Sequence, residues 1–324
     1  MLSGAPAVTA PAVVAEGQEV LVQVPATSAN LGPGFDSLGL AVTMYDTITV
    51  RTTGSGTTTV SVTGEGEASL PTDESHLVAA TILSTLERAG FSSPGLEIEA
   101  SNVIPHGRGL GSSAAAIVSS VLAANALLPS SAQLDSQAVL QLCSTLEGHP
   151  DNVAPALLGS LAVSWETDRA YRSTIIPVHP DVVPVVAIPA SELSTEAARA
   201  LLPASVPHDS ASANAGRAAL LVHAMTSAPQ FLFDATHDLL HQDYRAEAML
   251  HSASLMRALR AEGFAAVISG AGPTVMTLAV GEDQAAATVA AVERIVHAND
   301  DGVDWRVLRL NVDTEGAKVK VHQR

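Results

Sequence analysis

Residues 105–115 read P-H-G-R-G-L-G-S-S-A-A, and this stretch decides which fold the sequence predicts. It follows residues 96–100, whose alternating apolar side chains are typical of a strand, and it leads into residues 114–128, an uncharged, alanine-rich segment that is typical of a buried helix. A glycine-rich turn at the start of a helix gathers unpaired backbone N–H groups and the positive end of the helix dipole. The stretch therefore predicts an anion site, with phosphate as its ligand.

Two common phosphate loops do not match this stretch. A Walker loop needs Lys after its last glycine, and a dinucleotide fingerprint needs glycine where this chain has Ser112. The simplest alternative is a tight turn that Ser112 caps. Alternate glycines, paired serines and a buried helix together favour phosphate binding, and we expect Arg108 to add positive charge nearby.

Composition excludes several classes of protein. The chain has 324 residues, a net charge of −17, 47% hydrophobic residues and 3% aromatic residues. This length is typical of two domains, and the apolar content is too high for a disordered chain. The acidic excess disfavours nucleic acid or an anionic membrane as a partner, because both require clustered Lys and Arg. Cys143 is the single cysteine, so we expect a core residue, with no disulfide or thiolate metal cluster.

The remaining patterns predict an α+β fold. Residues 1–18 have no basic residue and contain two prolines, so we expect a disordered leader and no signal peptide. No apolar run is long enough for a membrane span. A soft boundary near 168–176 divides the chain into domains at 19–172 and 173–324. We expect strands at 20–24, 47–51, 57–63, 160–165, 182–188, 265–269, 275–279 and 305–312, and helices at 77–89, 136–146, 197–202, 211–228, 230–240, 246–261 and 284–297.

The glycine-rich stretch resembles the phosphate loop of the GHMP kinases, the superfamily of galactokinase, homoserine kinase, mevalonate kinase and phosphomevalonate kinase. Residues 25–36, P-A-T-S-A-N-L-G-P-G-F-D, and residues 147–155, E-G-H-P-D-N-V-A-P, resemble motifs of its homoserine kinase branch. Residues 268–274, I-S-G-A-G-P-T, resemble the third superfamily motif. The motifs occur in the family's order, and the resemblance covers the chain from about Glu19 onward.

The resemblance implies a two-domain fold. Its N-terminal domain is ribosomal-protein-S5-like, with a left-handed β-α-β unit that holds the phosphate loop, and its C-terminal domain is ferredoxin-like. The implied reaction is transfer of phosphate from ATP to the side-chain hydroxyl of L-homoserine, a step of threonine biosynthesis. Mg²⁺ as cofactor, a cytoplasmic location and a possible homodimer also follow from the resemblance.

The resemblance also assigns residues to the nucleotide and the metal. Ser112 and Glu147 are the expected groups near the metal ion. Relatives often carry an acidic residue where this chain has Thr145. The alternative for Glu147 is a solvated charge at the end of a helix. Residues 73–78 resemble the segment that flanks the adenine pocket, with His76 in place of an expected Asn. The nucleotide-binding residues expected are Pro105, His106, Gly107, Arg108, Gly109, Leu110, Gly111, Ser112, Ser113, Ala114, Ala115 and Gly272.

The expected homoserine pocket combines cationic and polar side chains. Arg199 and Arg245 resemble the family's clamp for the substrate carboxylate, although Asp243 stands where relatives have Pro. The polar wall for the ammonium and hydroxyl groups comprises Asn30, Asp36, His149, Asp151 and Asn152. Of these, Asp36, Asp151 and Asn152 are the candidate catalytic residues.

Several alternatives stay open. Asp151 or Asp36 could accept the hydroxyl proton, or the reaction could proceed without a dedicated base. His149 could orient the substrate or simply close its loop. His237 and His241 are four residues apart and could bind a metal, but no third ligand is evident. Two other functions compete with homoserine phosphorylation: a kinase for another small alcohol such as mevalonate, and a non-catalytic nucleotide-binding regulator.

Overall fold

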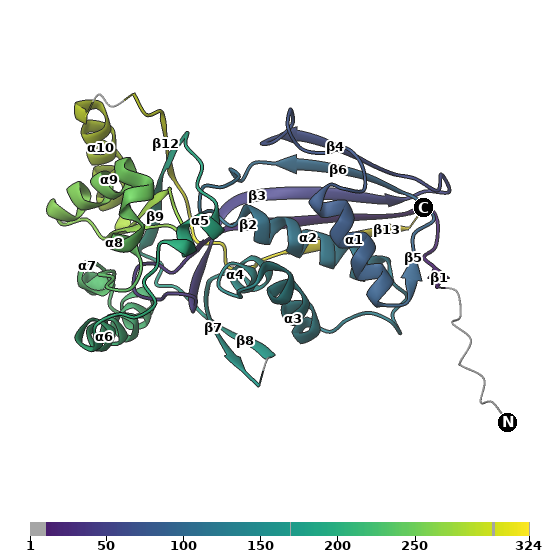
Figure 1. Cartoon of the computed structure of the whole chain (residues 1–324), viewed down its shortest axis with the longest axis horizontal. Coiled ribbons are helices and arrows are strands. Elements are labelled where there is room, and N and C mark those ends of the chain that lie inside the picture. The colour runs from purple at the N-terminus through teal and green to yellow at the C-terminus, as the bar shows by residue number, and fades with distance from the viewer. Residues whose placement is uncertain (1–10, 169, 300–301, 324) are drawn as a thin grey trace.

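Two large β-sheets with helices packed on them, together with a small two-stranded sheet, form an elongated molecule (Figure 1). The computed structural model describes residues 11–168, 170–299 and 302–323. The larger sheet has seven strands, in the order β13-β2-β3-β6-β4, with β7 paired to β3 and to β8. Its strands are β2 (Gln18–Ala29), β3 (Leu38–Thr52), β4 (Thr58–Gly64), β6 (Leu96–Asn102), β7 (Leu161–Thr167), β8 (Ala170–Ile176) and β13 (Lys318–Gln323).

The parallel pair in this sheet forms a β-α-β unit. Strands β4 and β6 pair in parallel, and α1 (Leu77–Arg88) lies between them in sequence. In β6 the side chains of Leu96, Ile98 and Ala100 are buried, while those of the intervening acidic residues are exposed. This alternation shows that only one face of the sheet is covered.

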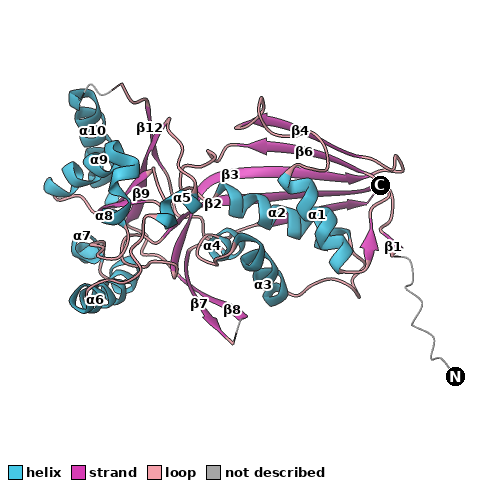
Figure 2. Ribbon diagram, viewed as in Figure 1, coloured by secondary structure: helices cyan, strands magenta, loops and turns pink. Residues whose placement is uncertain are grey.

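Four helices cover that face (Figure 2). The central one is α2, which has no charged residue and buries ten of its 16 residues. A helix this apolar needs protein on most of its sides. It therefore gives the preceding glycine-rich loop a rigid support. The other three helices are α1, α3 (Ser136–Glu147) and α4 (Val153–Leu158), and α2 itself spans Ser112–Leu127.

The second sheet has four antiparallel strands in the order β10-β11-β9-β12. Helices precede β10 and β12, and this order is the ferredoxin-like arrangement that we expected. Strand β9 is buried along its whole length. The strands are β9 (Val182–Pro189), β10 (Ala266–Ile268), β11 (Val275–Val280) and β12 (Trp305–Arg309), and the helices are α5 (Thr195–Ala200), α6 (His208–Thr226), η1 (Pro229–Phe231), α7 (Leu232–Ala235), α8 (Gln242–Arg245), η2 (Ala246–Met249), α9 (Leu250–Ala261) and α10 (Gly281–Asn299).

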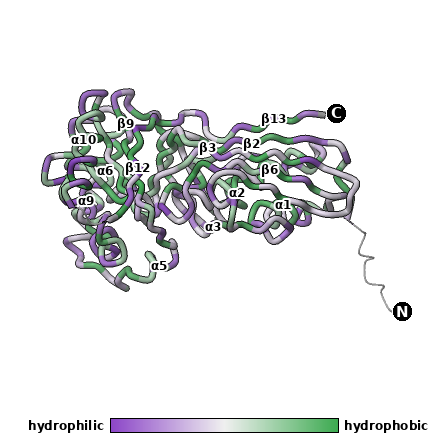
Figure 3. Tube along the Cα trace, turned by 90° about the horizontal axis from the view of Figure 1, so that it is seen from above, coloured by the Kyte–Doolittle hydropathy of each residue, from purple (hydrophilic) through white to green (hydrophobic). Residues whose placement is uncertain are grey.

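One hydrophobic core joins the two halves of the molecule. It includes Val22 of β2, Val118 of α2, Val186 of β9 and Leu221 of α6. Figure 3 shows hydrophobic stretches along the strands and hydrophilic stretches at the turns around them. None of the helices within the described ranges is long and apolar enough to cross a membrane. A shared core holds the two sheets in a fixed relation, which matters because the loops described below come from both.

Two strand pairings cross the expected domain division at residue 172. Strand β8 crosses it and pairs with β7, and β13 returns from the end of the chain to pair with β2. The expected leader at 1–18 lies partly outside the described residues, which begin at 11. Within it, the prediction of disorder is wrong for β1 (Ala12–Val13), which pairs in parallel with β5 (Phe91–Ser92). Short edge strands such as these are stabilised by distant partners, which local periodicity does not reveal.

The helix expected at 230–240 is also wrong. Helix α7 ends at Ala235, and the carboxylate of Asp238 accepts hydrogen bonds from the backbone N–H groups of Leu240, His241 and Gln242. An aspartate that bonds to nearby backbone N–H groups in this way competes with helical hydrogen bonding. The turn that results carries residues of the site described next.

Candidate active site

Three loops that are far apart in sequence meet where the two sheets join. The backbone N–H of Thr27 donates to the carbonyl of Leu110 at 3.1 Å, and that of Gly270 donates to the carbonyl of Ala29 at 3.0 Å. The hydroxyl of Ser269 donates to the carbonyl of Gly109 at 2.6 Å. The motifs at 25–36, 105–115 and 268–274 therefore form one structure.

The glycines of the 105–115 loop are required by its geometry. Gly109 and Gly111 both have φ of 73°, a region that favours glycine. A Cβ on Gly109 would overlap the carbonyl oxygen of Ser269, and a Cβ on Gly111 would overlap the hydroxyl of Thr27. Gly111 is also the N-cap of α2 and makes no side-chain capping bond, so the first N–H groups of the helix are left for a ligand. This is the geometry of an anion site.

The loop borders an open cleft of roughly 700 Å³. The opposite wall comes from the segment that follows α3 and from the start of α5. The lining residues are Ala29, Asn30, Pro105, Gly107, Arg108, Gly109, Gly111, Ser112, Ser113, Glu147, His149, Asp151, Asn152, Leu193, Ser194, Thr195, Arg199, Arg245, Gly270 and Ala271. The cleft therefore contains the anion site and most of the polar residues singled out in the sequence.

One end of the cleft carries two arginines. Arg199 pairs with Asp36 through two hydrogen bonds, Nη1 to Oδ2 at 3.0 Å and Nη2 to Oδ1 at 2.6 Å. This bonding to Asp36 raises the pKa of Arg199. Arg245 is 2% exposed, and burial lowers its pKa, but arginine stays protonated at neutral pH. Both guanidinium groups lie over the ring of Phe35, at 5.7 and 5.4 Å from its centroid.

The opposite wall carries a histidine and an aspartate. His149 Nδ1 lies 2.5 Å from Asp151 Oδ1, and Asp151 is buried. Burial alone would lower the pKa of His149, but the hydrogen bond to Asp151 and the negative charges of Asp151 and Glu147 together outweigh burial, and the pKa is raised. Next to this pair, Asn152 Oδ1 accepts a hydrogen bond from the Thr27 hydroxyl at 2.8 Å. His149 and Asp151 are therefore bonded to each other in this wall of the cleft.

A carboxylate lies beside the glycine-rich loop. Glu147 Oε2 accepts a hydrogen bond from the hydroxyl of Ser113 at 2.7 Å, and burial raises the pKa of Glu147. No group of three or more His, Cys, Asp or Glu side chains in the described ranges is placed to hold a metal ion unaided. Magnesium commonly binds one or two protein carboxylates and completes its shell with phosphate oxygens and water. Glu147, with Ser112 nearby in the same cleft, fits this pattern.

A second, more apolar pocket of roughly 750 Å³ lies on the other side of the loop. The two cavities share Gly107, Ser112 and Ser113. In the second pocket His76 is 4% exposed, its Nδ1 accepts from the Val78 N–H at 3.1 Å, and its Nε2 has no partner within the described structure. Burial lowers the pKa of His76. The pocket's remaining lining residues are Asp46, Ile48, Leu70, Leu77, Asn102, His106, Ala116 and Ser119.

The structure differs from two expectations for the loop. Arg108 does not offer a free charge, because its guanidinium donates to the carbonyls of His106, Pro189 and Ala190 and pairs with Glu192. Gly272 does not line the cleft but lies behind Gly109, while Gly270 and Ala271 line it. The remaining loop residues outside both cavities have buried side chains: Leu110, Ala114 and Ala115.

The two histidines considered as metal ligands do not lie together. His237 is exposed, whereas His241 is fully buried and bonds to Arg245. The residues of the site that sequence reasoning missed include Phe35, Thr27 and Asp46. Phe35 and Thr27 lie inside the motif at 25–36, so the motif itself was the available signal. Asp46 lies in a strand far from any motif and gave no signal.

Family models match both halves of the chain. Residues 76–160 match the N-terminal domain of the GHMP kinases, and residues 213–298 match their C-terminal domain. Among curated relatives, the homoserine kinase of Streptomyces coelicolor is 50% identical over 301 residues, 93% of this chain and 94% of its own length. The homoserine kinase of Mycobacterium tuberculosis is 47% identical over 263 residues, 79% of this chain and 82% of its own length.

Solved structures agree with this grouping. The crystal structure of homoserine kinase from Cytophaga hutchinsonii is 28% identical, with a TM-score of 0.82, and the match covers 93% of this chain and 97% of that one. Mevalonate diphosphate decarboxylase from Staphylococcus aureus is 14% identical with a TM-score of 0.65, and the match covers 94% of this chain and 98% of that one, so it shares the fold alone.

Proposed function

The chain belongs to the GHMP kinase family, and from this premise we propose that it is a homoserine kinase, which phosphorylates the side-chain hydroxyl of L-homoserine with ATP. The product is O-phospho-L-homoserine, and the step serves threonine biosynthesis. One observation carries the assignment of the site: the cleft places Arg199 and Arg245 in the same cavity as the glycine-rich loop. An amino-acid hydroxyl bound by these arginines can therefore lie next to a bound triphosphate.

The nucleotide spans the two cavities in this proposal. Its phosphates lie against the backbone N–H groups of Gly107, Gly109 and Gly111 and the start of α2. The base enters the apolar pocket, because Gly107, Ser112 and Ser113 border both cavities. His76 Nδ1 accepts from a backbone N–H, so its proton is on Nε2, which can donate to a ring nitrogen of adenine.

Glu147 and Ser112 would hold Mg²⁺ beside the bound phosphates. When bound, the ion neutralises the charge of the phosphate oxygens during transfer. The fit rests on the donor set, an oxygen-only pair beside an anion site. The hydrogen bond from Ser113 keeps the Glu147 carboxylate turned toward the loop.

Homoserine is bound by its two charged groups. Arg199 and Arg245 bind the carboxylate, and the charge-assisted bonds of a guanidinium suit that group. The carboxylate of Asp36 accepts from the ammonium, with Asn30 beside it, since Asn30 Oδ1 accepts from the Asp36 N–H at 3.0 Å. The ammonium and carboxylate of the substrate thus take over contacts that Asp36 and Arg199 make with each other in this structure.

The hydroxyl then points to the wall formed by His149, Asp151 and Asn152. The hydroxyl oxygen attacks the γ-phosphorus, the bond to the β-phosphate oxygen breaks, and ADP leaves. Asp151 is better placed than Asp36 to accept the hydroxyl proton, because Asp36 receives the substrate ammonium in this arrangement, whereas Asp151 lies in the wall that the hydroxyl faces. Most of the rate enhancement comes from positioning and charge, as is general for phosphoryl transfer. A cytoplasmic location and a homodimer stay predictions from the family resemblance.

Release of ADP tests the proposal. Purified protein with ATP and Mg²⁺ is assayed with L-homoserine, mevalonate, L-threonine or no acceptor. Turnover that depends on homoserine supports the proposal, turnover only with mevalonate supports the other kinase, and ATP binding without turnover supports the regulator. In a second arm, Arg245→Ala should raise KM for homoserine far more than KM for ATP. Equal effects on both KM values would place Arg245 outside the homoserine pocket.

A further inference from the structure

His241 is fully buried at the junction of the two halves, and the mechanism above gives it no role. It immediately precedes α8, four residues before Arg245, in the turn that Asp238 caps. Histidine is intermediate in its tendency to be buried, and a buried one usually has partners at both ring nitrogens. The partners of His241 come from both sides of the cleft.

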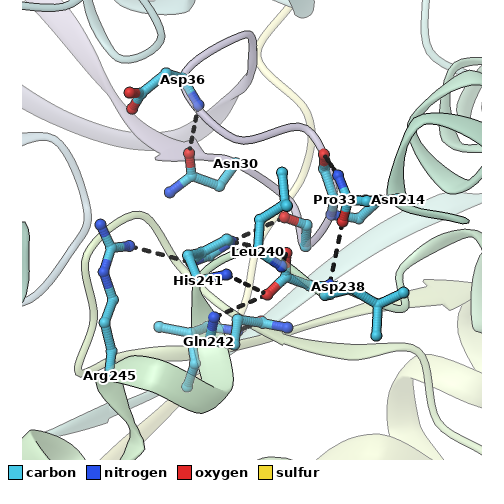
Figure 4. A network of polar contacts seen from close by, with 12 residues as sticks. Asn30, Pro33, Asp36, Asn214, Asp238, Leu240, His241, Gln242 and Arg245 are labelled. Atoms are coloured by element: carbon cyan, nitrogen blue, oxygen red, sulfur yellow. Dashed lines mark hydrogen bonds and ion pairs between the residues drawn. The ribbon is translucent and has the colours of Figure 1, made fainter. Parts of the chain in front are cut away.

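The partners fix which nitrogen of the ring carries the proton. His241 Nε2 lies 2.9 Å from the carbonyl oxygen of Gly32, and a carbonyl can only accept, so Nε2 is the donor. His241 Nδ1 lies 3.1 Å from Nη1 of Arg245, which can only donate (Figure 4). Burial and the nearby Arg245 charge lower the pKa of His241 despite Asp238, so the ring is neutral and Nδ1 is free to accept.

These bonds leave one terminal nitrogen of Arg245 for a ligand. Nε donates to the carbonyl of Ala198 at 3.2 Å, and Nη1 donates to His241. Nη2 makes no hydrogen bond to any residue of the described ranges, and Arg245 lines the cleft. The guanidinium plane is therefore set by two neutral acceptors, neither of which cancels its charge.

The ring also links Arg245 to the loop that carries Asn30 and Asp36. Gly32 belongs to that loop, and the ring of Phe35 stacks on His241 with centroids 5.2 Å apart. The backbone N–H groups of His241 and Gln242 both donate to Asp238, at 3.0 and 2.8 Å. His241 is therefore held rigidly, and it contacts the residues on both sides of the expected substrate site: the loop of Asn30 and Asp36 on the ammonium side, and Arg245 on the carboxylate side.

We propose that His241 is a positioning residue for homoserine recognition: its unprotonated Nδ1 fixes the guanidinium of Arg245 so that Nη2 faces the substrate carboxylate. The proposal rests on the proposed function, since it takes Arg245 as a ligand of that carboxylate. The histidine itself does not touch the substrate.

Two substitutions of the same histidine separate its two bonds. In His241→Asn the amide oxygen can replace Nδ1 as an acceptor for Arg245, while the bond to Gly32 is lost. In His241→Gln the amide nitrogen can reach Gly32, while the acceptor for Arg245 is lost. We expect His241→Gln to raise KM for homoserine about tenfold, the usual scale for one hydrogen bond to a charged group. His241→Asn should raise it much less, and KM for ATP should stay within about twofold in both.

A double-mutant cycle with Arg245→Ala shows whether the effect passes through the arginine. We expect His241→Gln to add no further rise in KM for homoserine in the Arg245→Ala background. His237→Gln is the matched control, because His237 is exposed and near in sequence, and it should leave both KM values unchanged. Thermal unfolding of each variant shows whether it is folded under the assay conditions.

Each outcome bears on a different claim. If Arg245→Ala raises KM for homoserine but His241→Gln does not, the proposal for His241 is overturned and the assignment of Arg245 stands. If Arg245→Ala leaves that KM unchanged, the assignment of Arg245 fails. Equal effects of the Asn and Gln variants, or full additivity with Arg245→Ala, would show that His241 acts by general packing. If His241→Gln does not fold, His241→Asn still tests the proposal. A large rise in KM for homoserine in folded His241→Asn, which keeps an acceptor for Arg245, is then sufficient to overturn it.

Discussion

The two ends of the cleft are built in different ways. At the phosphate end, one continuous loop offers backbone N–H groups, and its shape depends on glycines that allow no side chain. At the amino-acid end, side chains from four distant segments converge: Asp36, Asp151, Arg199 and Arg245. A substitution that changes the course of the loop displaces all of its N–H groups at once. A substitution at the amino-acid end removes only the contacts of one side chain. The two ends should therefore respond differently to substitution.

The largest effect is expected at the phosphate end, from Gly109→Ala. Its φ of 73° disfavours alanine, and the added Cβ would overlap the carbonyl of Ser269. Together these displace the loop, so we expect kcat/KM for ATP to fall about a thousandfold, equivalent to roughly 4 kcal/mol. Steady-state kinetics with varied ATP measures it.

Gly107→Ala is the matched control. Gly107 also has a positive φ, of 64°, but a Cβ there would lie 3.4 Å from the nearest atom, the Cβ of Glu192. We expect a loss of about tenfold, from backbone strain alone. If the two alanine variants lost the same activity, close contact with Ser269 would not explain the need for Gly109.

At the amino-acid end, Arg199→Ala should have the next largest effect. The substitution removes one of the two arginines that bind the substrate carboxylate in our proposal, and it leaves Asp36 without its ion-pair partner. We expect KM for homoserine to rise about thirtyfold with KM for ATP nearly unchanged, because a hydrogen bond to a charged group contributes about 2 kcal/mol. Arg199→Lys keeps the positive charge but cannot form a bidentate ion pair, so its KM for homoserine should lie between those of the unsubstituted protein and Arg199→Ala. A parallel rise in KM for ATP would mean that the two ends do not act independently.

The same contrast explains what the sequence predicted. The phosphate loop is contiguous, so residues 105–115 predicted both its position and its ligand. The amino-acid end was predicted only because its residues lie in motifs that resemble a family; no periodicity brings Asp36 next to Arg199. The bond from Ser113 to Glu147 and the Asp238 turn depend on side-chain geometry and gave no signal. Strand β13 was missed although residues 318–321, K-V-K-V, alternate as a strand does; only its pairing with β2, about 300 residues earlier, gave no local signal.

Glu147→Gln tests the boundary between the two ends. The amide keeps the shape of the side chain but is a poor ligand for Mg²⁺, so we expect the Mg²⁺ concentration for half-maximal activity to rise about tenfold. Titration of ADP release with Mg²⁺ at saturating ATP measures this. Thr145→Val is the control, since Thr145 bonds to the carbonyl of Gln141 and should have no effect. If Glu147→Gln had an unchanged Mg²⁺ requirement, Glu147 would not be a ligand of the ion, and the phosphates and other groups would bind it.

The smallest effect on the kinetics is expected from a substitution away from both ends of the cleft, and it serves as the reference for the other variants. The hydroxyl of Tyr45 in β3 donates to Asp313 at 2.8 Å, which ties the large sheet to the segment before β13. Partial burial and the bond to Asp313 raise the pKa of Tyr45 to about 12. Tyr45→Phe should leave both KM values unchanged and lower the free energy of unfolding by about 1 kcal/mol at pH 8.

This stabilisation should decline at high pH. The pKa of Tyr45 is higher in the folded chain than in the unfolded chain, so above pH 10 the unfolded chain loses the proton first. Stability from this group is therefore complete below pH 10 and is lost as the pH rises toward 12. Urea unfolding of both proteins at pH 8 and pH 10.5 should show the difference between them shrinking. A constant difference would mean that the hydrogen bond to Asp313 does not control the titration of Tyr45, and that packing of the ring provides its contribution.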